Sequence, residues 1–126
     1  MSEYTDYLLE QLHSLGPVAC RRMFGGYGLF LDELMFAIVA DDMLYLKTDS
    51  ENKPAFEERG LEPFIYFKQD KPVALSYHLA PEEALEDPEL LTAWARDACG
   101  AARRSAAQKR RRRSGGTRRA KGRRTS

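Results

Sequence analysis

Apolar residues in the first hundred positions recur first at helical spacing and then in short runs of strand length. Tyr4, Leu8 and Leu12 are spaced four residues apart, and Ser2 stands where a capping hydroxyl would begin a helix. Gly16-Pro17 predicts that this helix has ended. The apolar runs that follow are separated by Gly, Pro and acidic residues, a pattern that is typical of strands joined by turns.

Two acidic dipeptides predict tight turns between the first strands. Asp32-Glu33 and Asp41-Asp42 each separate two apolar runs, and residues 69–71 separate a later pair. Turns this short predict antiparallel hairpins, because parallel neighbours need a long crossover. We therefore expect a two-layer α+β fold with an antiparallel sheet of about five strands, in the order α-β-β-β-α-β-β-α. The predicted strands are residues 18–31, 34–39, 43–47, 64–68 and 72–79.

The later helices carry start and stop signals of their own. Asp49 or Ser50 can cap the second helix, Pro54 suits its first turn, and Gly60 suits its end. Asp87-Pro88 combines a capping carboxylate with proline at the first helical position. The last helix then carries an apolar stripe on one face, and we expect it to fray after residue 100.

Residues 21–31 combine two cations, three glycines within four positions and an apolar run. We interpret this stretch as one long strand with a glycine kink or bulge, because glycine adopts backbone angles that other residues resist. A phosphate-binding loop is the alternative, but such a loop runs from a strand into a helix. Arg21 and Arg22 should point to opposite faces, and we expect at least one of them to be buried against an acid. An exposed one would be free to contact an anion or a partner.

Charge divides the chain into two opposed segments. Residues 1–100 hold all 19 acidic residues and 8 of the 20 basic ones, for a net charge of −11, whereas residues 101–126 carry +12. We therefore predict a folded domain over residues 1–100 and a disordered basic tail over residues 101–126, because the tail has too little apolar area to offset chain entropy.

The tail is the feature that predicts a partner from composition alone. Its cations would follow a phosphate backbone without regard to sequence, and the absence of aromatic residues excludes base stacking. The tail could instead fold back on the acidic domain. The predicted nucleic-acid-binding residues are Arg103, Arg104, Lys109, Arg110, Arg111, Arg112, Arg113, Arg118, Arg119, Lys121, Arg123 and Arg124.

The sequence contains few signals for metal binding, catalysis or membrane association. Cys20 and Cys99 have no metal-ligand spacing and are expected to be reduced packing residues, as in a cytoplasmic protein. His13 and His78 have no ligand neighbours at metal spacing. The longest apolar run, residues 34–40, is too short to cross a membrane, and no signal peptide is visible. We predict no catalytic residues, no metal, no cofactor and no membrane association.

Several separated segments together resemble one known family. The segments are Arg21-Arg22-Met23-Phe24-Gly25-Gly26-Tyr27-Gly28 and residues 44–47, 60–64, 71–73 and 80–83. In this order they resemble the TfoX N-terminal-domain family over roughly residues 2–100. The resemblance implies a two-layer domain similar to secretion-chaperone folds, a link to transcription of natural-competence genes, and no catalytic residues. Larger members add a helical C-terminal domain, and this chain has the arginine-rich tail in that place.

Three functional hypotheses follow. The first is a non-enzymatic regulator or adaptor whose domain contacts protein and whose tail binds nucleic acid. The second is a homodimeric protein-interaction module with an incidental tail, because residues 34–39 are apolar on both faces of their strand. The third is an enzyme for a small anionic substrate, and it requires convergence of Arg21, Arg22, Tyr45, Lys47 and Tyr77 in one pocket.

Overall fold

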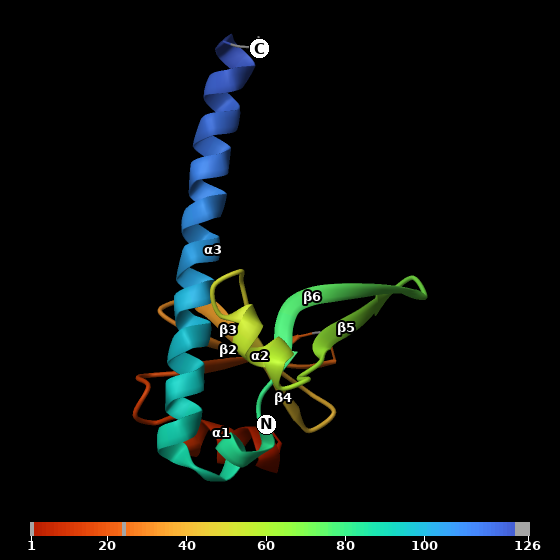
Figure 1. Ribbon diagram of the computed structural model, residues 1–126, viewed down its shortest axis with the longest axis vertical. Helices are drawn as coiled ribbons and strands as arrows, with labels where there is room; N and C mark the ends of the chain where they lie inside the picture. The colour runs from red at the N-terminus through yellow and green to blue at the C-terminus, as the bar shows by residue number, and fades with distance from the viewer. Residues whose placement is uncertain (1, 24, 123–126) are drawn as a thin grey trace.

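A six-stranded antiparallel sheet forms one layer of the molecule, and helices pack on it to form the other (Figure 1). The computed structural model describes residues 2–23 and 25–122, with side chains as far as residue 113. The sheet order is β1-β2-β3-β4-β6-β5. The predicted α+β class is confirmed, with one strand more than expected. The elements are α1 (Glu3–Gln11), β1 (Ala19–Met23), β2 (Gly26–Leu31), β3 (Leu34–Ala40), β4 (Met43–Lys47), α2 (Lys53–Glu58), β5 (Pro63–Lys68), β6 (Lys71–Leu79), the 3-10 helix η1 (Glu82–Glu86) and α3 (Pro88–Gly122).

The extra strand comes from the glycine-rich stretch, where the prediction of one kinked strand was wrong. β1 and β2 form a hairpin in which Met23 pairs with Gly26, and Gly25 lies in the turn with a φ of 74°. That left-handed angle suits glycine and reverses the chain instead of bending it. A β-bulge does occur, but it lies farther along, between Leu29 and Phe30. Phe24, the remaining residue of this motif, lies outside the described residues.

The other predicted turns are confirmed by their backbone angles. Asp32 and Glu33 have φ values of 53° and 67°, and Asp41 and Asp42 have 52° and 57°. Two consecutive positive φ values are typical of type I′ turns, whose twist matches that of the flanking antiparallel strands. Local turn chemistry therefore sets the hairpins β2–β3 and β3–β4.

The main core lies between one face of the sheet and the helices. Leu29, Leu44 and Leu46 are fully buried on this face, and they meet Leu8 of α1 and Leu91 of α3. α3 crosses β3 and β4, and α1 packs near its first turns (Figure 1). The opposite face carries a smaller cluster of Ile38, Phe64 and Tyr77, with half-buried apolar residues around it.

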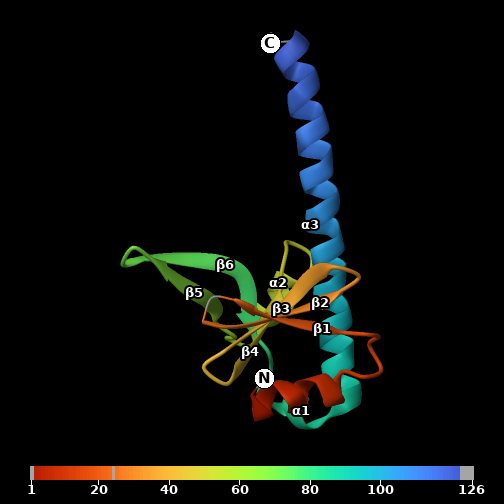
Figure 2. The same cartoon turned by 180° about the vertical axis from the view of Figure 1, so that it is seen from behind.

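α3 differs from the expected helix that frays into a disordered tail. It runs without interruption from Pro88 to Gly122 and projects well beyond the sheet (Figure 2). Ala101 and Ala102 are still buried, so the helix passes residue 100 inside the packed body. Its packed turns supply the nucleus, and each further residue then adds one hydrogen bond at low cost. Ala, Arg, Lys and Gln, which dominate residues 101–113, are strong helix formers.

Candidate polyanion-binding helix

α3 places the predicted nucleic-acid-binding residues in two environments. Arg104 is half-buried at the level of the sheet, whereas Arg103 and every cation from Lys109 to Arg113 are exposed. Arg118, Arg119 and Lys121 belong to the helical backbone of α3, and Arg123 and Arg124 lie outside the described residues.

Arg104 anchors the helix to the loop that follows β4. Its Nε lies 2.5 Å from Oδ2 of Asp49 and one terminal nitrogen lies 3.0 Å from Oδ1, so the guanidinium donates two hydrogen bonds to one carboxylate. Glu51 adds a second carboxylate at 3.3 Å from Nε. The hydrogen bond from Arg104 lowers the pKa of the Asp49 carboxyl. The acidic body therefore takes up one cation of the basic segment.

The next cations differ from Arg104 in having no such partner. Lys109, Arg110, Arg111 and Arg112 form no salt bridge with any acidic residue in the part of the chain that the structure describes. They are held on a helix that leads away from the sheet (Figure 2). The helix thus carries a run of cations outward from a body whose residues 1–100 have a net charge of −11.

Arg21 and Arg22 do not form the predicted buried ion pair. Both side chains are exposed, and neither has a salt-bridge partner among the described residues. Arg21 instead lies over the ring of Phe30, 4.6 Å from its centroid. β1 lies at the edge of the sheet, where both guanidinium groups are exposed to water. Because neither charge is buried, neither needs an acidic partner to offset the loss of hydration.

The five residues of the enzyme hypothesis do not converge. Lys47 and Tyr77 are cross-strand neighbours on β4 and β6, with the Lys47 ammonium 5.1 Å from the ring centroid of Tyr77. Tyr45 packs against Phe64 with ring centroids 5.0 Å apart. Arg21 and Arg22 lie on β1, with β2 and β3 between them and β4. The convergent set that this hypothesis required is absent from these positions.

His78 and Cys99 are buried in the packed interior of the fold. Nδ1 of His78 lies 3.2 Å from Oγ1 of Thr48, and burial lowers the pKa of the His78 imidazole. Burial raises the pKa of the Cys99 thiol to about 11, which keeps it protonated and unreactive near neutral pH. Within residues 2–23 and 25–122, no group of three His, Cys, Asp or Glu side chains is arranged to hold a metal ion. In the same part of the chain, no helix is long and apolar enough to cross a membrane.

Two of the motif glycines, Gly26 and Gly28, lie in close packing contacts. A Cβ on Gly26 would stand 2.1 Å from the backbone oxygen of Val39, and one on Gly28 would stand 2.6 Å from Sδ of Met35. The Val39 oxygen is part of the backbone, so β2 can lie against β3 in this register only with glycine at position 26, whereas at position 28 the flexible Met35 side chain would have to shift. Residues 10–102 of this chain match the TfoX N-terminal domain. The chain belongs to that family. Its glycine motif is thus the packed β1–β2 hairpin of a TfoX N-terminal domain.

Curated members of the TfoX/Sxy group are similar to this chain over most of its folded part. DNA transformation protein TfoX1 of Aliivibrio fischeri is 32% identical over 98 residues, which cover 78% of this chain and 47% of that protein. Protein Sxy of Escherichia coli is 32% identical over 73 residues, covering 58% and 35%. DNA transformation protein TfoX of Haemophilus influenzae is 38% identical over 74 residues, covering 58% and 33%. The matched region thus spans less than half of the length of each of these relatives.

Sequence reasoning missed one grouping of side chains. Lys47 of the sheet lies beside Lys109, Arg110 and Arg113 of α3, and together they line one cavity. A signal for it was present in the helix. The apolar stripe through Ala98 and Ala102 continues at the same spacing into Lys109 and Arg113, so those cations occupy the helix face that looks toward the sheet.

Proposed function

We propose that this TfoX-like chain is a non-enzymatic regulatory protein that binds nucleic acid through the projecting half of α3. The observation that carries the proposal is the run from Lys109 to Arg113, exposed on a rigid helix beyond an acidic body. An α-helix about 10–12 Å across fits the major groove of B-DNA, and its Lys and Arg side chains reach phosphates on either side. Since relatives are named DNA transformation proteins, we infer a link to transcription in DNA transformation. We also propose that the protein acts in the cytoplasm.

Binding of this kind is electrostatic and independent of base sequence. If about six cations met phosphates, log K would fall with log salt at a slope near −5. Fluorescence anisotropy with two labelled duplexes of unrelated sequence, titrated between about 50 and about 200 mM KCl, measures this slope. We expect similar affinities for the two duplexes at each salt concentration.

A charge-matched pair of variants assigns the binding to the helix. Arg111, Arg118 and Arg119→Gln removes three cations of α3, and we expect the slope to become shallower by about 3. The control variant, Lys53, Lys68 and Lys71→Gln, makes the same charge change on exposed positions of α2 and the β5–β6 hairpin. The control should bind as the unaltered protein does. Equal weakening by the two triple variants, or negligible binding at the lowest salt, would contradict the proposal.

A homodimeric interaction module is the second candidate, favoured by the face of the sheet that carries Ile38, Phe64 and Tyr77. Apolar side chains continue across this face at its rim, where Met43 is 47% and Val73 is 39% exposed. Burying such a surface in a symmetric dimer would release water from both copies.

Solution mass decides the second candidate. We expect sedimentation equilibrium at physiological salt to give a dimer that Met43→Lys and Val73→Lys together convert to a monomer, because two charges would be buried without partners. A stable interface of this kind buries more than about 1,000 Å². A monomer mass for the unaltered chain across the working concentrations would remove this candidate.

A further inference from the structure

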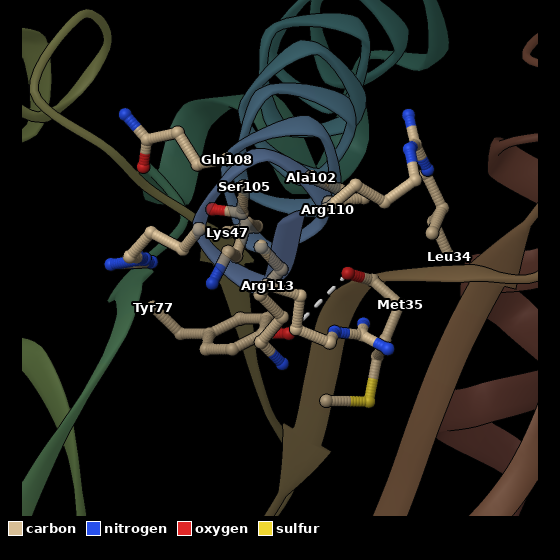
Figure 3. Close-up of a pocket in the computed structure, with 12 residues that line it drawn as sticks. Leu34, Met35, Lys47, Tyr77, Ala102, Ser105, Gln108, Arg110 and Arg113 are labelled. Atoms are coloured by element: carbon tan, nitrogen blue, oxygen red, sulfur yellow. Dashed lines mark hydrogen bonds between the residues drawn. The ribbon is translucent and has the colours of Figure 1, made fainter. Parts of the chain in front are cut away.

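A cavity of about 500 Å³ lies where α3 leaves the sheet. Figure 3 shows residues of two elements around it, Met35, Lys47 and Tyr77 from the sheet and Ser105, Arg110 and Arg113 from α3. The volume falls within the range of about 300–1,000 Å³ that is typical of small-ligand sites.

The charges around the cavity are of one sign. Lys47, Lys109, Arg110, Arg112 and Arg113 line it, and none of the described lining residues is acidic. This is unusual in a chain whose first hundred residues hold all 19 carboxylates. Asp49 and Glu51 form ion pairs with Arg104, which is not among the described lining residues. The described lining of the cavity therefore gathers cations with no carboxylate among them.

Lys47 experiences this concentration directly. Burial lowers the pKa of its ammonium, the nearby charge of Lys109 lowers it further, and the charge of Asp49 acts in the opposite direction. Its stem is fixed by β4, and its ammonium lies 5.1 Å from the ring centroid of Tyr77. An anion in the cavity would relieve the repulsion between Lys47 and Lys109, and that relief is a source of binding free energy.

The geometry also indicates the class of anion. Tyr77 is 7% exposed, and its hydroxyl already donates a hydrogen bond to the backbone oxygen of Met35 at 3.3 Å (Figure 3). No aromatic face is therefore open for a nucleobase among the described lining residues. The charged side chains of the described lining carry guanidinium groups and two ammonium groups, which match phosphate oxygens.

We propose that this cavity is a phosphate-binding site for a polyanion, with Lys47 as its ligand from the sheet and Lys109, Arg110 and Arg113 as its ligands from α3. The phosphates are those of a free polyphosphate or those of a nucleic-acid backbone. The site does not depend on the proposed function, because a free polyphosphate needs only the cavity, and Arg111, Arg118 and Arg119 are not among its described lining residues.

Calorimetric titration of the full chain with tripolyphosphate tests the site. We expect saturable binding that Lys47→Gln weakens by at least about tenfold, since a hydrogen bond between charged groups is lost. Lys109→Gln, on an exposed helical position, should weaken binding in the same direction without affecting folding. Lys53→Gln, 49% exposed on α2 and outside the cavity, is the control and should bind as the unaltered chain does.

A second arm with a short DNA duplex distinguishes the two sources of phosphate. If Lys47→Gln weakens tripolyphosphate binding alone, the ligand is a free polyphosphate. If it also weakens duplex binding, the backbone enters the cavity. The proposal is overturned if the unaltered chain does not bind tripolyphosphate saturably, or if Lys47→Gln and Lys109→Gln both bind it as Lys53→Gln does. The triple variant Arg111, Arg118 and Arg119→Gln should retain tripolyphosphate binding even where its duplex binding is lost.

Discussion

Gly26 is the residue at which the family motif can be tested most directly. A methyl group there would stand 2.1 Å from the backbone oxygen of Val39, which belongs to the central strand β3 and cannot move independently. We expect Gly26→Ala to lower the free energy of unfolding by about 2 kcal/mol or more, through displacement of β2 from β3. Urea denaturation followed by far-ultraviolet circular dichroism measures the change.

Gly100→Ala is the matched control for that substitution. Gly100 lies within α3, and a Cβ there would meet the end of the Arg104 side chain at 3.3 Å. Because alanine favours helix over glycine and a side-chain end can shift, we expect the free energy of unfolding to be unchanged or to rise by up to about 1 kcal/mol. Equal destabilisation by both substitutions would show that close packing of β2 on β3 is not the reason for the motif glycine.

Residue-scale features with local causes were predictable from the sequence. Ser2 caps α1, accepting a hydrogen bond from the Thr5 N–H at 3.1 Å, and Asp87 does the same for Leu90 at 3.2 Å. These caps need only residues three positions apart. The exposure of Arg21 was not predictable, because it depends on β1 lying at the sheet edge.

At the scale of elements, the ion pair between Arg104 and Asp49 holds α3 to the loop after β4. Asp49→Asn keeps an oxygen for the N–H groups of Glu51 and Asn52 but removes the charge that Arg104 contacts. The Asp49 side chain is 19% exposed and that of Arg104 is 38% exposed, so solvent weakens the ion pair. We expect this substitution to cost about 1 kcal/mol at neutral pH, measured by urea denaturation.

Because of the same ion pair, the free energy of unfolding should depend on pH. The pKa of Asp49 is lower in the folded chain than in the unfolded chain, chiefly because Arg104 donates a hydrogen bond to it. The stabilisation is therefore complete well above the unfolded value of about 4 and is lost as the pH falls through the folded value. Denaturation at a series of pH values should show the unaltered chain and Asp49→Asn converging in acid. A constant difference down to the lowest pH would contradict the assignment.

Two elements differ from the prediction because they depend on tertiary contacts. The sequence predicts one strand in place of the β1–β2 hairpin because Gly25 is equally compatible with a bulge and a reversal, and only the pairing of Met23 with Gly26 distinguishes them. α3 continued past Gly100 because a glycine inside an anchored helix costs only about 1 kcal/mol. The cavity beside Lys47 was predictable only in part: helical spacing places Lys109 and Arg113 on the face of α3 toward the sheet, but their approach to Lys47 depends on the tertiary position of α3.

The whole molecule separates its charges along one direction. Residues 1–100 carry −11 and residues 101–126 carry +12. In the absence of nucleic acid, the projecting helix of one copy should therefore attract the acidic body of another. The attraction reaches about 30 Å at 10 mM salt and about 8 Å at 0.15 M.

Sedimentation velocity at these two salt concentrations measures that attraction. We expect the average sedimentation coefficient to rise with protein concentration at low salt and to return to a concentration-independent value at high salt. Arg111, Arg118 and Arg119→Gln should reduce the low-salt association more than Lys53, Lys68 and Lys71→Gln does. An identical dependence of the sedimentation coefficient on protein concentration at both salt concentrations would exclude this attraction between copies.

The continuous backbone of α3 has a thermodynamic consequence for any partner of its outer half. A tail without structure would have to give up chain freedom when it settles on a polyanion, at a cost of about 1–2 kcal/mol for each residue that becomes fixed. Residues 109–122 are already helical, so association with a rigid partner leaves their main-chain order as it was. Calorimetry would then find a small heat-capacity change, and displaced counterions would supply most of the driving force.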